Sequence, residues 1–502
     1  MPTLTVIFTV QWSIDMRAIM QKHRSSIHKQ FWNYVFNASY QLLIMAAALV
    51  TTPFLARNLG PSDLGIYGYV VSVSAIAHTV TLVSLYTYGS RQIAYCRDSA
   101  SEVNRVFWEL MILRCLLCAL ESVVYLYVAN RTPYVRLFLI YYPWILANAL
   151  DVTWLFIGFE DMKTVVLKNV AVKVACVLSI FAFVKGNDGL VSYLLIMSSY
   201  TLIGNIAVYP QLRQYVSKPD FGSGFLRRHL LGAMKLFIPE VTPTLTHRIN
   251  HVTMGQVLDS KDDIAFFDQG EKIVNIPSSL VTAMNSVVMP RIANEHARHQ
   301  NRSIEDYVVW VGSAALMVAI PLSAGVASIA DRLVPWFFGP GFERAIDVIR
   351  FLSPVIVIDS LIGTVGSQYL TATDRTLALN WSNGIGLLVN VLLNLSLVPM
   401  AGCVGAVVST VVARLAILIS QVVVTIDKLS YGRIALSMIR YSAASLAMAA
   451  VILLVGRLVV NDITCTIIQI ACGCVSYTLL LYMCADPILK ALLTVFAREG
   501  SS

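Results

Sequence analysis

Residues 190–208 read LVSYLLIMSSYTLIGNIAV, an apolar stretch without a charged side chain, and stretches of this kind decide the fold. About 20 apolar residues in a helix cross the hydrocarbon core of a bilayer, where every backbone polar group must be bonded within its segment. The 502-residue chain contains fourteen such stretches, which predict an all-α polytopic membrane protein with about 14 transmembrane helices. They are 32–55, 64–86, 106–128, 134–156, 165–184, 190–208, 229–254, 266–289, 307–329, 346–370, 377–399, 404–426, 434–456 and 463–484.

The composition agrees with a membrane protein and restricts its function. Hydrophobic residues make up 57% of the chain and charged residues 13%, with a mean hydropathy of +0.69. That charged share is about half of what soluble domains carry. Since no loop has room for a soluble domain, the chain must move a solute or a lipid, or do chemistry at the membrane surface. The nine cysteines lie mostly within spans and lack histidine or acidic neighbours, so no metal or cofactor is predicted.

The distribution of lysine and arginine predicts the orientation. Cytoplasmic loops collect these residues, and most of the 37 fall on one side if the amino terminus is inside. Both termini are therefore expected in the cytoplasm. The net charge of +8 follows from this asymmetry and requires no nucleic acid partner.

A long basic loop near the middle of the chain predicts two bundles. The loop at 210–228 contains proline, glycine and four cations, and it separates the sixth span from the seventh. We expect two six-helix lobes plus two C-terminal helices. The expected parts are an N-terminal extension at 1–20, an N-lobe at 21–212, a cytoplasmic linker at 213–228, a C-lobe at 229–427, and the last two spans with a cytoplasmic tail at 428–502.

Two neighbouring spans carry polar stripes. Ionisable groups inside a span are costly unless they face a cavity or a partner, so they mark function by default. Spacings of three and four residues place the first set on one helical face, and the second set follows much the same pattern. One interpretation is structural pairing, of Glu240 with Arg248 or of Asp268 with Lys272. The other is a water-filled cavity that binds an anion. The stripes are Glu240, Thr244, Arg248 and His251 in one span, and Asp268, Lys272, Asn275, Ser279 and Asn285 in the next.

Further residues are candidates for gating and coupling. Pro239 and Pro243 flank Glu240, and proline in a span permits bending, so they indicate either a gate or a simple distortion of the helix. Asp151 and Asp359 lie inside spans without an evident partner, and an acidic residue in a lumen can carry a coupling proton. Glu240 and Asp268 are candidates for the same roles.

Five segments together resemble the motifs of bacterial polysaccharide repeat-unit flippases. These are Wzx-like proteins of the multidrug/oligosaccharidyl-lipid/polysaccharide exporter superfamily, and the resemblance covers about residues 20–430. The segments are FLARNLGPSDLGIYGY (54–69), YGSRQIA (88–94), WLFIGFED (154–161), EKIVNIPSSLVTAMNSVVMPRIA (271–293) and LVPMAGCVGAVVST (397–410). One position departs from the family pattern, which often has an aspartate where this chain has Asn250.

The resemblance implies two helical lobes that work by alternating access, ion coupling, and a place in the bacterial cytoplasmic membrane. It implies a polyprenyl-pyrophosphate-linked oligosaccharide as substrate, membrane lipids as surroundings, and a polysaccharide polymerase and other assembly proteins as partners. An anionic, hydroxylated head group needs cations and amide or hydroxyl groups. The candidates are Arg57, Arg91, Arg248, Lys272 and Arg291, with Asn275 and Thr244 as neutral partners. Arg57 and Arg91 are equally interpretable as anchors at the membrane surface.

Three other functions compete with this expectation. A membrane-embedded polymerase or glycosyltransferase needs a long extracytoplasmic loop or paired carboxylates, and the outer loops are short, so no enzyme is predicted. An exporter of cationic drugs favours an acidic lumen, whereas both stripes include cations. A scaffold that transports nothing does not explain the stripes.

Overall fold

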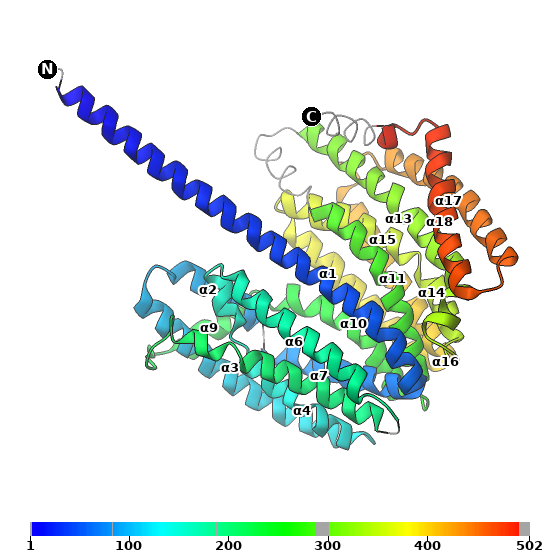
Figure 1. Cartoon of the computed structure of the whole chain (residues 1–502), viewed down its shortest axis with the longest axis horizontal. Helices are drawn as coiled ribbons and strands as arrows, with labels where there is room; N and C mark the ends of the chain where they lie inside the picture. The colour runs from blue at the N-terminus through cyan, green and yellow to red at the C-terminus, as the bar shows by residue number, and fades with distance from the viewer. Residues whose placement is uncertain (1–2, 83, 187, 287–300, 491–502) are drawn as a thin grey trace. The chain divides into compact units, whose positions relative to one another are not determined.

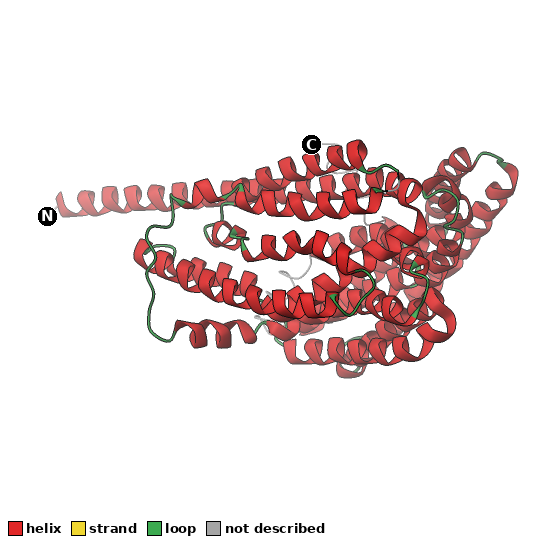
Figure 2. Cartoon of the chain, turned by 90° about the horizontal axis from the view of Figure 1, so that it is seen from below, coloured by secondary structure: helices red, strands yellow, loops and turns green. Residues whose placement is uncertain are grey.

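The computed structural model describes residues 3–82, 84–186, 188–286 and 301–490, and these residues form helices joined by short loops without a strand (Figure 2). Ten of the described helical stretches are long and apolar enough to cross a membrane. The predicted fold class, an all-α polytopic membrane protein, is therefore confirmed. The number of spans, fourteen, stays a prediction.

Two long helices each contain a pair of predicted spans. Helix α1 (Thr3–Leu82) has a non-helical residue at Gly60, and α16 (Thr376–Thr425) has one at Gly402, where φ is +57°. Both glycines fall between spans that the sequence separates. The predicted extension at 1–20 is helical from Thr3 and continuous with the rest of α1. Its separate status stays a prediction.

Two predicted spans are each divided by a break that the hydropathy pattern does not reveal. The fourth consists of α4 (Val135–Ala149) and α5 (Thr153–Gly158). The break follows from Asp151, because its Oδ1 accepts hydrogen bonds from the backbone N–H of Thr153, at 2.9 Å, and from the Thr153 hydroxyl. The seventh consists of α9 (Phe225–Met234) and α10 (Phe237–Val257).

The tenth span is divided into three helical segments. They are α14 (Arg344–Leu352), α15 (Val355–Ile362) and a π-helix, η1 (Gly363–Leu370), with Pro354 at the start of α15. Proline lacks the N–H that would continue the ladder of α14, so a helix boundary at this point is expected. π-Helical turns are frequent at functional sites.

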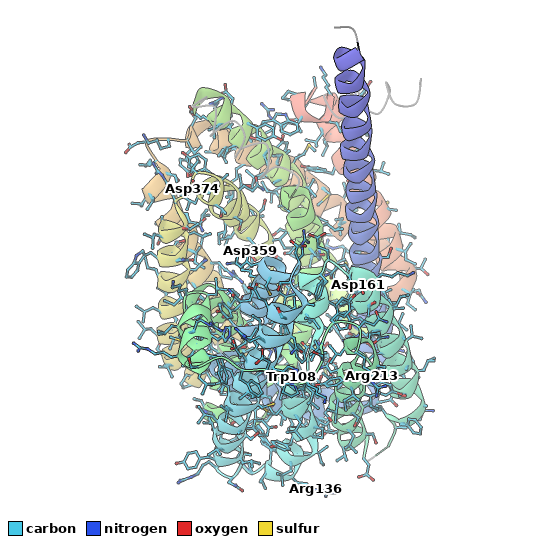
Figure 3. All side chains as sticks on the ribbon, turned by 90° about the vertical axis from the view of Figure 1, so that its left-hand side faces the viewer. Trp108, Arg136, Asp161, Arg213, Asp359 and Asp374 are labelled. Atoms are coloured by element: carbon cyan, nitrogen blue, oxygen red, sulfur yellow. The ribbon has the colours of Figure 1, made fainter. Side chains whose placement is uncertain are left out.

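The chain divides into two compact units. Unit 1 comprises Met1–Thr51, Leu82–Phe183 and Ser192–Ala233. Besides α4, α5 and α9 it contains α2 (Leu85–Cys96), α3 (Ala100–Ala129), α6 (Met162–Phe183), most of α7 (Gly189–Ile206) and α8 (Tyr209–Leu212). Asp161, labelled in Figure 3, precedes α6, and its carboxylate accepts hydrogen bonds from the N–H and the hydroxyl of Thr164. In the core of the unit the ring of Trp154 stacks on that of Phe107.

Unit 2 comprises Thr52–Thr81, Val184–Val191 and Met234–Ser502. It contains α10, α11 (Asp262–Ser286), α13 (Asn301–Phe337), α14, α15, η1, α16, α17 (Tyr431–Leu458) and α18 (Asp462–Met483). Helices α13, α17 and α18 pack side by side (Figure 1) around a core that includes Leu316, Tyr441, Ile452 and Leu481. The predicted lobe boundaries stay predictions.

Candidate functional site

The polar stripe of α11 meets that of α10 at Asp268. One carboxylate oxygen of Asp268 lies 2.7 Å from Nζ of Lys272, one turn further along α11. The other oxygen lies 3.4 Å from Nε2 of His251 on α10. The side chain of His251 is 1% exposed and that of Asp268 is 18% exposed, whereas that of Lys272 is 46% exposed. A nearly buried carboxylate is thus held between an imidazole and an ammonium group that reaches the surface of the unit.

A second pair lies one turn away on the same two helices. Nδ1 of His247 lies 3.2 Å from Oε1 of Glu271, whose side chain is 17% exposed. His247 precedes His251 by four residues and Glu271 follows Asp268 by three, so each pair of side chains shares one helical face. The two helices therefore present a ladder of two histidine–carboxylate contacts.

Asp359 and Arg414 extend this arrangement to α15 and α16. Nε of Arg414 lies 3.5 Å from Oδ1 of Asp359, which is labelled in Figure 3. Helix α15 packs against α11 and helix α16 packs against α10, so this pair belongs to the same group of helices as the two histidine–carboxylate contacts. All these residues belong to unit 2. We call this group the charge cluster, and its members are His247, His251, Asp268, Glu271, Lys272, Asp359 and Arg414.

The charge cluster does not balance when its histidines are neutral. It contains three carboxylates against two permanent cations, and protonation of one histidine makes it neutral. Charged groups enclosed among apolar helices are stable only when they are paired or hydrated. The cluster can therefore bind and release a proton, or exchange an internal ion pair for an external ion.

The structure separates the residues of the first predicted stripe. Glu240 and Arg248 form no ion pair in the described part of the chain, so the structural pairing considered for these two residues is not seen. They are eight residues apart, about 12 Å along a helix, whereas residues three or four apart are neighbours. Among the described residues, the side chains of Arg248 and Thr244 have no bonded partner. The predicted Asp268–Lys272 pair is present.

The remaining candidates are dispersed. Arg57 donates a hydrogen bond to the backbone carbonyl of Trp336 in unit 2, and Arg91 is exposed on α2 of unit 1. Asn275 is exposed on α11. Oδ2 of Asp151 lies 4.0 Å from the guanidinium of Arg114, and its Oδ1 accepts a hydrogen bond from the N–H of Thr153 at the start of α5. A role of Asp151 in coupling stays a prediction. Arg291 lies outside the described residues.

The proposed gate consists of Pro239 and Pro243 at the start of α10. Helix α10 begins at Phe237 and continues through Pro243 to Val257. Pro239 falls in its first turn, where proline replaces an N–H that has no partner inside the helix. A role of either proline in gating stays a prediction.

Asn250, the position that departs from the family pattern, belongs to a neutral hydrogen-bonded group. Its amide donates to Oγ1 of Thr410 at 2.8 Å, and its carbonyl accepts from the amide of Asn394 at 2.7 Å. All three side chains are buried. Asn250 therefore carries no ionic charge. The charged side chains belong to the charge cluster, whose member His251 is the next residue of α10.

Three members of the charge cluster were not among the candidate residues predicted from the sequence: His247, Glu271 and Arg414. The first two follow from the same helical spacing that selected His251 and Asp268. The partnership of Asp359 and Arg414 could not be found in this way, because the two side chains belong to different helices.

The fold and the charge cluster define a polytopic membrane protein with charged groups inside its helical bundle, as transporters have. The chain belongs to the polysaccharide biosynthesis protein family, whose model matches residues 32–296. This confirms the family that the motifs predicted. A putative O-antigen transporter of Escherichia coli (strain K12) is 23% identical over 354 residues, which are 67% of this chain and 82% of the relative.

Solved structures share the fold. The lipid II flippase MurJ in an inward closed conformation has a TM-score of 0.70 at 16% identity, covering 90% of this chain and 98% of the flippase. An inward-facing multidrug resistance MATE family transporter of the MOP superfamily has a TM-score of 0.60 at 14% identity, covering 80% of this chain and 95% of the transporter. At these identities the likeness establishes the fold.

Proposed function

We propose that this chain flips polyprenyl-pyrophosphate-linked oligosaccharide repeat units from the inner to the outer leaflet of the bacterial cytoplasmic membrane, for synthesis of a surface polysaccharide. The observation that carries the proposal is the charge cluster inside unit 2 of a chain that belongs to the polysaccharide biosynthesis protein family. The relative named as an O-antigen transporter and the flippase with the same fold support this class of substrate. A polysaccharide polymerase would receive the product on the outer side.

Transport works by alternating access and is coupled to protons at the charge cluster. The histidines and carboxylates of α10 and α11 can exchange a proton, and this changes the net charge of the cluster. Asp268 and Asp359 are the coupling carboxylates, because each already contacts a cation that competes with a proton. A protonated cluster and a deprotonated cluster then favour different conformations of the same helices.

Arg248 supplies a cation for the substrate. It lies on α10 between the two histidines of the charge cluster, and its guanidinium has no partner in the described structure. A guanidinium can bind phosphate through two parallel hydrogen bonds, and Thr244, one turn earlier, offers a hydroxyl group. The lipid tail can stay in the bilayer while the head group crosses.

An exporter of cationic drugs is less well supported. The charge cluster includes Lys272 and Arg414, and a cationic drug would have to displace or approach both. The TM-score to the flippase also exceeds that to the multidrug transporter.

The test is a bacterial strain from which the chromosomal copy has been deleted. We expect lipid-linked repeat units to accumulate in the inner leaflet, where a membrane-impermeant oxidant of sugars cannot reach them, and the plasmid-borne gene to restore their exposure. Unchanged exposure of repeat units in the deletion strain would contradict the proposal.

The same strain tests Arg248. Loss of one charge-assisted phosphate contact, worth about 1.5–3 kcal/mol, reduces affinity about tenfold or more, so Arg248→Ala should transport poorly at normal protein levels. Arg248→Lys should keep part of the activity. The control is Arg213→Ala, which removes an exposed arginine directly after α8 and should transport normally. Full activity of Arg248→Ala would exclude Arg248 from substrate binding.

A further inference from the structure

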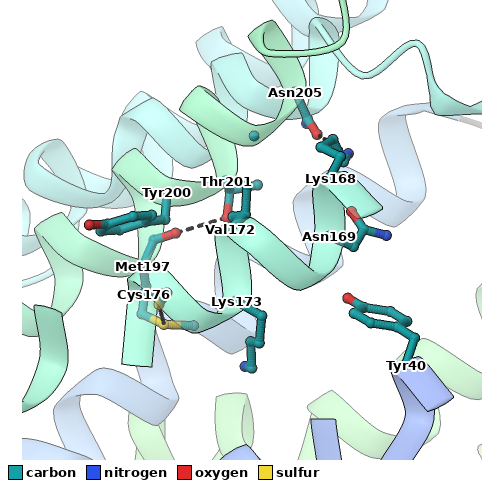
Figure 4. Close-up of a pocket in the computed structure, with 11 residues that line it drawn as sticks. Tyr40, Lys168, Asn169, Val172, Lys173, Cys176, Met197, Tyr200, Thr201 and Asn205 are labelled. Atoms are coloured by element: carbon teal, nitrogen blue, oxygen red, sulfur yellow. Dashed lines mark hydrogen bonds between the residues drawn. The ribbon is translucent and has the colours of Figure 1, made fainter. Parts of the chain in front are cut away.

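A pocket of about 240 Å³ lies within unit 1, between α6, α7 and the part of α1 that belongs to this unit. Its wall contains two lysines of α6, Lys168 and Lys173 (Figure 4). Further polar groups of the wall come from Tyr40 of α1, Asn169 of α6, and Tyr200, Thr201 and Asn205 of α7. None of these residues belongs to the charge cluster, which lies in unit 2.

Among the residues whose side chains the structure describes, neither lysine has a carboxylate beside it. Nζ of Lys168 lies 3.4 Å from Oδ1 of Asn205, a neutral amide. Asp151 acts on the charge of Lys168 from a greater distance, but its carboxylate is already bound by Thr153 and lies near Arg114. Lys173 has no ion pair in the described part of the chain.

Lys173 lies at the middle of α6, where a lysine without an ion-pair partner is unexpected. It lies eleven residues after Met162, the first residue of the helix, which corresponds to about 17 Å of a helix about 33 Å long. A lysine near the middle of a membrane-spanning helix is costly unless it faces water or an anion. The pocket gives Lys168 and Lys173 a common polar space, so an anion there would satisfy both.

The size of the pocket limits what can enter it. Pockets that bury drug-sized ligands measure about 300–1,000 Å³, so 240 Å³ admits a head group rather than an oligosaccharide. The wall offers two cations, and a pyrophosphate has two linked phosphates for them to contact, whereas a monophosphate has one. The hydroxyl of Tyr40 and the amide of Asn169 can donate to the phosphate oxygens.

We propose that the pocket in unit 1 is a subsite for the pyrophosphate of the lipid-linked substrate, held by Lys168 and Lys173. The inference rests on the proposed function and adds to it a second anion-binding place, in the N-terminal part of the chain and separate from Arg248.

The experiment measures equilibrium binding of polyprenyl pyrophosphate to the purified full chain in nanodiscs of phosphatidylcholine. Loss of one charge-assisted contact should weaken binding about tenfold in Lys173→Gln and in Lys168→Gln, and Lys173→Arg should stay within about threefold of the parent chain. Lys163→Gln removes an exposed lysine of the first turn of α6 that does not line the pocket, and it should bind normally. Thermal unfolding of each variant verifies that it is folded.

Two comparison lipids identify the ligand. Polyprenyl monophosphate should bind more weakly than the pyrophosphate, and phosphatidylglycerol should not compete at similar concentrations. Competition by phosphatidylglycerol at the concentration of the pyrophosphate would overturn the proposal in favour of a site for bilayer lipid. Normal binding by both glutamine variants would overturn it too while leaving the proposed function intact. A parent chain that binds no polyprenyl pyrophosphate would contradict the proposed function itself, and the subsite with it.

Discussion

Among single residues, Asp268 offers the sharpest test of coupling, because its carboxylate contacts both His251 and Lys272. Asp268→Asn keeps the size of the side chain and its ability to accept a hydrogen bond, but removes the charge. Lys272 is 46% exposed and can be hydrated instead, so we expect a loss of stability below about 1 kcal/mol. Transport driven by a proton gradient into proteoliposomes should fall strongly, because the site can no longer exchange a proton.

The control for Asp268 is Asp306→Asn. Asp306 pairs with Arg433 at 2.7 Å, and both side chains are half exposed, so its loss should change neither stability nor transport. Proton-driven transport by Asp268→Asn at the parent rate would remove Asp268 from the coupling mechanism.

Some residues of the charge cluster can be predicted from the sequence and others cannot. Asp268, Lys272 and His251 were found because spacings of three and four residues place side chains on one helical face. Asp359 was noticed as a charge without an evident partner, but its contact with Arg414 depends on the packing of α15 against α16, which residue spacing within one helix does not contain. The pocket of unit 1 could not be predicted for the same reason, because Lys168 and Lys173 form a pocket wall only together with Tyr40 and residues of α7.

Among the helices, the kink of α16 at Gly402 is a feature that sequence and structure share. A Cβ on Gly402 would lie 2.3 Å from Oδ2 of Asp263, and the backbone there has φ +57° and ψ −131°. That conformation is essentially restricted to glycine and costs other residues about 1–3 kcal/mol. Gly402→Ala should therefore lower the midpoint of thermal unfolding in detergent.

Gly384→Ala is the matched control for Gly402→Ala on the same helix. Nothing lies within 4 Å of a Cβ built at Gly384, which lies in the helical part of α16. Alanine in a helix interior is about 0.5–1 kcal/mol better than glycine, so this variant should unfold at the same temperature or slightly higher. Equal midpoints for Gly402→Ala and the parent chain would show that α16 adapts at the kink.

Helix α3 holds the linker segment through hydrogen bonds of Asn104 and Glu109. Glu109 of α3 is fully buried, and its carboxylate accepts hydrogen bonds from the N–H of Gly222, at 2.9 Å, and from Arg228, and lies 2.7 Å from Nε2 of His229. Asn104 of the same helix donates to the carbonyl of Lys218. Glu109→Ala should cost about 1–3 kcal/mol, because it leaves buried donors without an acceptor, and should speed tryptic cleavage after Lys218.

The control for Glu109 is Glu102→Ala, an exposed carboxylate in the first turn of α3. Its removal leaves the linker contacts intact, so cleavage after Lys218 should proceed at the parent rate. If Glu109→Ala and Glu102→Ala were cleaved equally slowly, the contacts of Glu109 would not be what holds the linker.

The helix breaks mark a second limit of prediction. Hydropathy alone gives continuous spans at 134–156 and 346–370, but both are divided. In each case a local hydrogen bond or a proline decides the boundary: the carboxylate of Asp151 caps α5, and Pro354 starts α15. Hydropathy averaged over about 20 residues is insensitive to a single carboxylate or proline. The same average suffices to establish that the segment is a membrane helix.

For the whole molecule, hydrophobic patterning was enough to predict the class, because a bilayer admits few spanning structures besides helices. The family followed from motifs spread over several helices, and its model matches residues 32–296. Neither source predicts which residues form a compact unit. Thr52–Thr81 of α1 belong to unit 2, although they precede most of unit 1 in the sequence, because membership depends on contacts made after folding.

The orientation of the whole chain is the last prediction, and it rests on the placement of the loop cations. A cysteine at Lys185, in the loop after α6, should be labelled by a membrane-impermeant maleimide added to intact cells from which any outer membrane has been permeabilised. A cysteine at Asp427, in the turn after α16, should be labelled only after the cytoplasmic membrane is opened. Both positions are exposed in the structure, so protection at either one reports the membrane and not burial.

The parent chain with its nine native cysteines sets the background of this experiment, since Cys115, Cys474 and Cys484 are exposed. Labelling is therefore scored as the increase over the parent. If the cysteine at Asp427 reacted from outside and the one at Lys185 did not, the chain would be inverted and both termini would lie outside. The excess of lysine and arginine would then face the extracytoplasmic side, against the rule that places these residues in cytoplasmic loops. The direction proposed for the substrate, from the inner to the outer leaflet, would fail with it.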